Sequence, residues 1–171
     1  MKNFKPTAAR KIKTKQEIEK VVQELRNADK NICIVTTNGA FDLIHSGHIT
    51  SLEHAKSLGD ILIVGLNSDS SVKRYKSNLR PIIPQKERAK MLASLEAVDY
   101  VVIFEEDNPN ALLEIIKPNK HVKSKSGFKG LERETVENHG GEITLLDDVI
   151  GISTTQILNK VLDIYQKEGK I

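Results

Sequence analysis

This 171-residue sequence has a single cysteine and no long apolar stretch, and both shortages limit the classes of protein to which it can belong. The single cysteine, Cys33, has no partner for an internal disulfide and belongs to no cysteine cluster that would indicate a zinc site. No apolar run approaches the roughly 20 residues that a membrane-spanning helix needs. The first residues also lack the apolar core of a signal peptide. We therefore expect a cytoplasmic protein without a membrane partner.

The sequence also lacks a large excess of charge of one sign. The chain has 26 Lys and Arg residues against 23 Asp and Glu, a formal net charge of +3. This excess is too small to indicate a nucleic-acid partner. Internal repeats and low-complexity tracts are absent, and the length suits one hydrophobic core. We expect a single domain over residues 14–171. A flexible tail is expected over residues 1–13, where lysines are frequent and the apolar pattern is weak.

Short runs rich in Val, Ile and Leu alternate with segments of helical spacing, which predicts an α/β fold. Thr14 and Glu17 have the spacing of a capping box, so a helix should begin at Lys15. Strands that alternate with helices form right-handed parallel crossovers. We expect a Rossmann-like, doubly wound sheet of five parallel strands. The predicted strands are 32–35, 61–66, 99–104, 120–123 and 142–146, and the predicted helices are 15–28, 49–58, 70–76, 86–97, 109–117, 131–138 and a last one after Ser153.

Residues that could bind a ligand or take part in catalysis lie directly after the first predicted strand. Residues 38–42 read Asn-Gly-Ala-Phe-Asp, and residues 45–48 read His-Ser-Gly-His at a predicted helix start. Gly39 allows the backbone to turn sharply or to approach a ligand closely. The first amides of a helix lack partners within the helix, so phosphate oxygens bind well there. Two imidazoles at such a helix start indicate an anion site.

These two segments together resemble the signature of the cytidylyltransferase-like nucleotidyltransferases, whose His-x-Gly-His element grips a nucleoside triphosphate. The resemblance runs from Thr14 to the last predicted helix and is greatest for the bacterial heptose 1-phosphate adenylyltransferases, which make ADP-heptose for lipopolysaccharide. Further matching stretches are 64–69, 80–88, 96–99, 122–123, 140–142 and 153–155. The resemblance implies an HxGH nucleotidyltransferase that transfers AMP from ATP, with Mg²⁺, to heptose 1-phosphate or a related sugar phosphate. It also implies release of pyrophosphate and a homodimer.

The resemblance implies roles for particular residues. No metal-binding residues are proposed, because Mg²⁺ is expected to accompany ATP. Lys123 follows a predicted strand, so its ammonium should lie over the same sheet edge as the histidines. The hydroxyls of residues 153–155 precede the last helix as an N-cap cluster. The catalytic candidates are His45, His48 and Lys123; the nucleotide-binding candidates are Asn38, Gly39, Ala40, Phe41, Gly47, Arg88, Ser153, Thr154 and Thr155; and the substrate-binding candidates are Asp42, Asn67, Asp69 and Arg80.

Two other functions are compatible with the same residues. One is a cytidylyltransferase that uses CTP with glycerol 3-phosphate or another polyol or sugar phosphate, since residues 151–155 also resemble those enzymes. Asp148, however, stands where they carry an arginine. Residues 124–128 (Ser-Lys-Ser-Gly-Phe) likewise depart from the Gly-Gly-Asp-Tyr stretch of the heptose enzymes. The other is a nucleotide-binding protein without turnover, against which the intact His45, His48, Lys123 and Arg88 argue.

Overall fold

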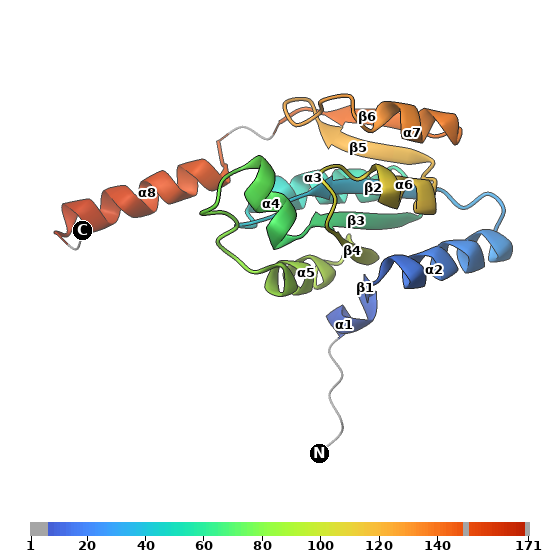
Figure 1. Ribbon diagram of the computed structural model, residues 1–171, viewed down its shortest axis with the longest axis horizontal. Coiled ribbons are helices and arrows are strands. Elements are labelled where there is room, and N and C mark those ends of the chain that lie inside the picture. The colour runs from blue at the N-terminus through green and yellow to red at the C-terminus, as the bar shows by residue number, and fades with distance from the viewer. Residues whose placement is uncertain (1–6, 149–150, 170–171) are drawn as a thin grey trace, which may run out of the picture.

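The computed structural model describes residues 7–148 and 151–169, which form a parallel sheet covered by helices (Figure 1). The strand order is β1-β4-β3-β2-β5-β6, and every neighbouring pair is parallel. This confirms the predicted doubly wound α/β fold. The strands are β1 (Ile12–Lys13), β2 (Ile34–Gly39), β3 (Ile61–Asn67), β4 (Tyr100–Phe104), β5 (Lys120–Ser124) and β6 (Glu142–Leu146). The helices are α1 (Thr7–Lys11), α2 (Lys15–Ala28), α3 (Ser46–Ser57), α4 (Asp69–Tyr75), α5 (Gln85–Ala93), α6 (Asn110–Ile116), α7 (Arg133–Asn138) and α8 (Thr154–Lys167).

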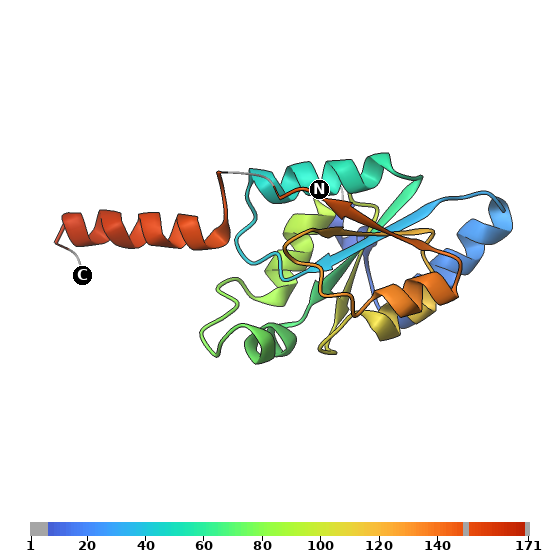
Figure 2. The same ribbon diagram turned by 90° about the horizontal axis from the view of Figure 1, so that it is seen from above.

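Two apolar clusters cover the two faces of the sheet, because successive strand residues point to opposite sides. On β3, Leu62 and Val64 belong to the first cluster, whereas Ile63 belongs to the second. Helices α3 and α5 contribute Leu52 and Leu92 to the first cluster, and α2 and α6 pack into the second. Figure 2 shows the sheet edge-on between these helical layers. The buried side chains therefore fix the helices on both faces.

The N-terminal segment is more ordered than the sequence indicated. Residues 1–13 were expected to be a flexible tail around a five-stranded sheet, but residues 7–13 form α1 and a sixth strand, β1, which pairs with β4 through Ile12 and Val101. Ala8 is buried in the first apolar cluster, and Lys11 Nζ donates to Val98 O at 2.6 Å. Two apolar positions are too few to produce a recognisable period, so the sequence pattern missed them. Residues 1–6 lie outside the described residues.

Helix boundaries follow the capping signals where these exist. Glu17 N donates to Thr14 Oγ1 at 3.2 Å and Thr14 N donates to Glu17 Oε2 at 2.7 Å, so the predicted capping box is confirmed and α2 begins at Lys15. Helix α5 is shorter than predicted, since it ends at Ala93 rather than at residue 97. The chain must turn back there, because Asp99 N already pairs with Leu62 O at 3.0 Å to start the next strand.

The strand order reverses direction between β2 and β5. These strands are neighbours, with Thr37 opposite Val122, although β3 and β4 lie between them in the chain. Strand β2 leads into α3 on the first apolar cluster, whereas β5 leads to α7, which packs against α6 of the second cluster. Segments that leave neighbouring strands toward opposite faces open a crevice at the carboxyl edge of the sheet. The fold therefore places a ligand site after Gly39 and Ser124.

Helix α8 extends away from the sheet and its covering helices (Figures 1 and 2). None of its residues is buried. Apolar side chains nevertheless lie along it, and Val161, Leu162, Ile164 and Tyr165 are 43–51% exposed. Among residues 7–148 and 151–169, no helix has both the length and the apolar character required to span a bilayer.

Candidate active site

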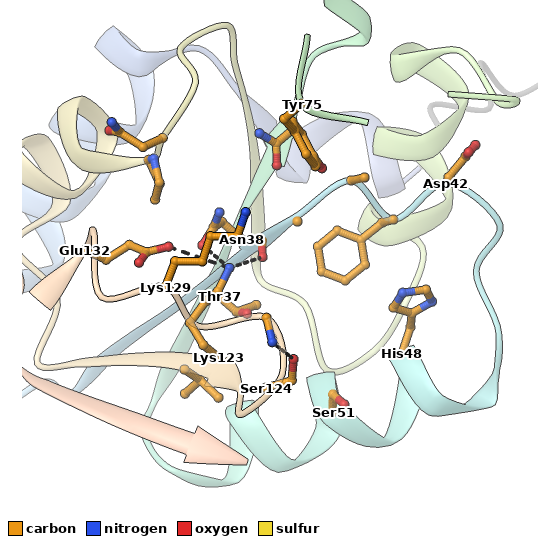
Figure 3. Close-up of a pocket in the computed structure, with 18 of the residues that line it drawn as sticks. Thr37, Asn38, Asp42, His48, Ser51, Tyr75, Lys123, Ser124, Lys129 and Glu132 are labelled. Atoms are coloured by element: carbon orange, nitrogen blue, oxygen red, sulfur yellow. Dashed lines mark hydrogen bonds and ion pairs between the residues drawn. The ribbon is translucent and has the colours of Figure 1, made fainter. Parts of the chain in front are cut away.

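A pocket of about 410 Å³ occupies the crevice at the carboxyl ends of β2 and β5 (Figure 3). The lining comes from the loops after these strands, from the first turns of α3 and α8, and from the segments around α4, α6 and α7. Of the residues proposed from sequence, the structure brings nine to this lining: Asn38, Gly39, Ala40, Phe41, Asp42, His48, Asn67, Lys123 and Thr154.

The loop after β2 is tied down by Asp42. This carboxylate is only 2% exposed, and it accepts hydrogen bonds from the amides of Ile82 and Ile83 at 2.8 and 2.9 Å and from Arg80 Nη1 at 2.9 Å. Gly39 was expected to allow a sharp turn or a close approach to a ligand, and the positive φ of this loop, +45°, lies at Phe41. A positive φ is uncommon for a bulky residue and marks a strained, over-determined loop. Asp42 therefore holds the loop in this conformation.

His45 and His48 lie against each other at the start of α3. Their ring centroids are 3.8 Å apart, and the Phe41 ring lies 5.3 Å from that of His48. Gly47 makes this stacking possible, because a Cβ there would approach the His45 ring to 3.1 Å and Ile152 to 3.4 Å. His48 reaches the pocket, whereas His45 is not among the lining residues and lies behind it. Both rings belong to the same helix N-terminus, where the helix dipole favours negative charge.

The two imidazoles are neutral at pH 7. Burial lowers the pKa of His48 to about 4, with further lowering by the nearby His45 and Lys76. Burial also lowers the pKa of His45. The Nδ1 atom of each ring is buried without a hydrogen-bond partner. A neutral imidazole still donates one N–H, so the pair presents hydrogen-bond donors without a fixed positive charge.

Lys123 bridges the two strands that border the pocket. Its Nζ donates to the backbone oxygen and to Oδ1 of Asn38, at 3.2 and 3.0 Å, and lies 3.7 Å from Glu132 Oε1. Burial lowers the pKa of Lys123, and the negative charge of Glu132 acts in the opposite direction. The ammonium is thus held in place by its partners at the centre of the pocket (Figure 3).

The three hydroxyl residues at the start of α8, residues 153–155, have different positions. Ser153 caps the helix, with its Oγ accepting from Gln156 N at 3.2 Å. Thr154 lines the pocket and its Oγ1 donates to Leu43 O at 3.5 Å. Thr155 is exposed. The first turn of α8 therefore contributes one hydroxyl, from Thr154, to the pocket.

Arg88 is placed differently from the sequence-based expectation of a phosphate contact. It is fully buried, and its guanidinium is surrounded by protein acceptors. Nη2 binds Asp69 Oδ1 at 2.6 Å, Nε binds Ile83 O at 2.8 Å, and Nη1 binds Asn67 O at 2.9 Å as well as Ala40 O. Neither Arg88 nor its partner Asp69 lines the pocket, nor does Arg80. Arg88 connects the loop after β2 to the end of β3 from behind.

The pocket also contains residues that the sequence did not single out. Lys76 lines it, and burial together with Arg80 lowers the pKa of its ammonium. Its basic neighbourhood was visible in the sequence, but such clusters usually face solvent. Glu132 and Lys129 come from the segment before α7, in which the sequence gave no signal. Among the described residues, no group of three His, Cys, Asp or Glu side chains is arranged to hold a metal ion.

Known proteins are similar to this chain over most of its length. A model of the cytidylyltransferase-like family matches residues 36–160. The bifunctional protein HldE of Pelobacter propionicus is 45% identical over 159 residues, covering 91% of this chain and 32% of that protein. HldE of Nitratiruptor sp. is 52% identical over 151 residues, covering 88% and 32%. The chain thus spans about a third of the length of the curated relatives it matches.

Among solved structures, the lipopolysaccharide core biosynthesis protein from Thermoplasma volcanium is similar in fold. Its TM-score is 0.59 at 24% identity, over 70% of this chain and 98% of that one. The pantoate-β-alanine ligase from Francisella tularensis gives a TM-score of 0.55 at 18% identity, over 91% and 78%. The matched family segment includes both histidines, Lys123 and the start of α8, and the chain belongs to the cytidylyltransferase-like family.

Proposed function

We propose that this protein is a nucleotidyltransferase that transfers AMP from ATP to a sugar phosphate, with heptose 1-phosphate as the favoured acceptor. One observation carries the proposal: His48, Lys123, Lys76 and Thr154 line a single pocket at the carboxyl edge of the sheet. A pocket with three ammonium groups (Lys76, Lys123 and Lys129), one imidazole of a stacked pair and a helix N-terminus suits a triphosphate. The adenylyl preference rests on the resemblance of the motifs to heptose 1-phosphate adenylyltransferases.

The proposed reaction is a direct displacement at phosphorus. An oxygen of the sugar phosphate forms a bond to the α-phosphorus of ATP, and the bond from that phosphorus to the bridging oxygen of the β-phosphate breaks. Pyrophosphate leaves with the electron pair of the broken bond, and the product is a nucleotide-activated sugar. Such chemistry requires alignment and charge stabilisation more than a protein nucleophile.

The residues take roles that follow from their positions. His48 donates a hydrogen bond to an α- or β-phosphate oxygen as negative charge moves toward the leaving group, and His45 supports its ring from behind. Lys123 and Lys76 neutralise phosphate charge from the centre and the α4 side of the pocket. Amides of the loop at residues 39–41 and the Thr154 hydroxyl supply neutral donors. Asp42 and Arg88 position that loop rather than touch the substrate.

Mg²⁺ enters this proposal together with the triphosphate. Two of the pocket carboxylates have close cationic partners, Asp42 in Arg80 and Asp107 in Arg74, and Glu132 lies 3.7 Å from the Lys123 ammonium. Mg²⁺ keeps several waters and often binds chiefly to substrate phosphates. These residues therefore fit a metal carried mainly by the nucleotide, whose chemical contribution is to neutralise phosphate charge. Because ATP is abundant in the cytoplasm, the proposal places the reaction there.

CTP with a polyol or sugar phosphate remains the second candidate, since the family is cytidylyltransferase-like. Asp148 does not favour it. This residue stands where the resembled cytidylyltransferases carry an arginine, and it is bound to Ser126, whose Oγ donates to Asp148 Oδ1 at 2.7 Å. A carboxylate repels rather than attracts a phosphate.

Pyrophosphate release tests both candidates. The purified chain is incubated with Mg²⁺ and each of ATP and CTP, against heptose 1-phosphate, hexose 1-phosphates and glycerol 3-phosphate. The expected result is release with ATP and heptose 1-phosphate, with the nucleotide sugar identified by mass spectrometry. Release with CTP alone would replace the adenylyl assignment, and no release with any pair would favour a binding protein without turnover.

We also propose that the protein forms a homodimer. The support is the exposed apolar side of α8, which an identical helix from a second copy would cover with the same residues on both sides. Light scattering at micromolar concentration measures the molar mass directly. A mass of one chain at every concentration would contradict this proposal.

A further inference from the structure

Glu132 is a buried carboxylate whose hydrogen-bonding capacity is largely unused. It immediately precedes α7 and is 6% exposed, yet it lines the pocket. Its Oε1 lies 3.7 Å from Lys123 Nζ, which is longer than a charge-assisted hydrogen bond. Its Oε2 is buried without any hydrogen-bond partner. Carboxylate oxygens accept about four hydrogen bonds in all, and a buried acceptor that lacks a donor destabilises the unliganded protein.

A second buried acceptor lies close to Glu132, in a residue that does not line the pocket. Asn110 directs its Nδ2 to Leu131 O at 3.0 Å, which leaves its own Oδ1 buried and without a partner. Asn110 and Leu131 thereby fix the start of α6 beside the residue that precedes α7. Of these two unpartnered acceptors, only that of Glu132 belongs to a pocket-lining residue. A ligand group that contacts Glu132 Oε2 must donate a hydrogen bond.

The two ends of the pocket differ in chemistry. His48 and Glu132 lie on opposite sides of it, with the Lys123 ammonium between them (Figure 3). The His48 side, together with Lys76 and Thr154, suits phosphate oxygens, which accept hydrogen bonds. The Glu132 carboxylate would repel a phosphate, but it accepts well from an uncharged hydroxyl. A substrate that spans both sides must combine phosphate with hydroxyl groups.

We propose that Glu132 accepts a hydrogen bond from a hydroxyl group of the sugar part of one substrate, and that this bond selects hydroxylated substrates over their deoxy analogues. The inference rests on the proposed function, since it assigns the far side of the same pocket. The hydroxyl belongs either to the ribose of the nucleotide or to the acceptor sugar. Glu132 is then a specificity-determining residue for the proposed reaction.

The test compares parent and deoxy substrates in wild-type and variant enzymes. One arm uses ATP, 2′-deoxy-ATP and 3′-deoxy-ATP, and the other uses heptose 1-phosphate and its monodeoxy analogues. In the arm that contains the bound hydroxyl, wild-type kcat/KM should fall about 10- to 100-fold with the deoxy substrate, the size expected for one hydrogen bond to a charged group. In Glu132→Gln and Glu132→Ala the same preference should shrink to about threefold or less.

The ratio of substrates separates this role from an indirect one. Loss of the Glu132 charge also alters Lys123, but that effect lowers kcat/KM for the parent and deoxy substrates by the same factor and leaves the ratio unchanged. Glu134→Gln, an exposed glutamate on α7, is the matched control and should keep the wild-type preference. Circular dichroism and thermal unfolding check that each variant is folded.

The outcomes distinguish this inference from the proposed function. If the wild-type enzyme is active and Glu132→Gln, Glu132→Ala and Glu134→Gln all discriminate against the deoxy substrate as the wild type does, the proposed role of Glu132 is overturned. The proposed function would still stand. If the wild type releases no pyrophosphate, the proposed function fails, and calorimetric titration of ATP and its deoxy forms into wild type and Glu132→Gln then decides the binding role. Equal discrimination by both proteins in that titration would overturn it.

Discussion

At the scale of single residues, burial strongly lowers the pKa of two histidines, His48 and His121. The pKa of His48 is lowered to about 4 and that of His121 to about 3. Yet the two rings serve different purposes. His48 reaches the pocket, whereas His121 is enclosed on β5, where its Nδ1 lies 2.8 Å from Thr36 Oγ1. We expect one histidine to control turnover and the other to control acid stability.

Replacement of His48 by alanine should lower kcat at least ~100-fold, because one preorganised donor to the transition state is lost. Turnover is followed by pyrophosphate release, and unfolding is monitored to exclude a folding defect. His54→Ala is the matched control, since this histidine is exposed on the same helix. Near-normal turnover in His48→Ala would remove this residue from the catalytic set.

His121 should make the protein less stable in acid. An unfolded histidine has a pKa of about 6.5, whereas the folded pKa of His121 is about 3. Above pH 6.5 neither state binds the proton, so stability is unaffected. As the pH falls below 6.5, only the unfolded state binds it, and the free energy of unfolding drops by roughly 3 kcal/mol by pH 4.5.

Urea unfolding between pH 7.5 and 4.5 measures that dependence. In His121→Gln, which retains a polar partner for Thr36, the slope of stability against pH should become clearly shallower. The exposed His54→Gln should leave the slope unchanged. An identical slope in wild type and His121→Gln would show that other groups cause the acid sensitivity.

At the scale of secondary-structure elements, Arg88 connects three segments that form the back of the site. Its guanidinium reaches the loop after β2, the end of β3 and the segment before α5. Arg88→Lys keeps the charge but cannot reproduce the planar fork of donors. We expect it to lower the free energy of unfolding by about 3 kcal/mol, because buried acceptors lose their donors.

Chemical denaturation of Arg88→Lys, compared with the exposed Arg10→Lys on α1, provides the measurement. A positioning role also predicts that the surviving folded enzyme binds ATP more weakly. Wild-type stability combined with a raised KM for ATP would instead place Arg88 on the phosphates, as the sequence suggested.

The sequence predicted most elements, and the reasons for its failures are physical. Val- and Ile-rich strands, the capping box at Thr14 and the His-x-Gly-His helix start are local signals, and the structure has an element at each. β1 was missed because two residues show no period. The positive φ at Phe41 could not be predicted, because this conformation is usually adopted by glycine. Glu132 was missed because its partner, Lys123, is close only in the folded chain.

At the scale of the whole molecule, α8 decides how the protein associates. Leu162→Glu introduces a charge among side chains that would be covered in a dimer, so we expect it to shift the protein toward the monomer. Gln156→Glu adds the same charge at an exposed position whose neighbours one turn on, Asn159 and Lys160, are polar, and it is the control. Size-exclusion chromatography with light scattering measures both. A dimer that persists in Leu162→Glu would place the interface elsewhere.

The reversal of strand order between β2 and β5 has a consequence for how such proteins diverge. The pocket there is walled by loops, and none of the described residues 124–128 belongs to either apolar cluster. This segment can therefore be exchanged for another without repacking the interior. Substrate specificity and folding stability therefore depend on different residues. A relative can change its acceptor substrate while the sheet and its covering helices stay the same.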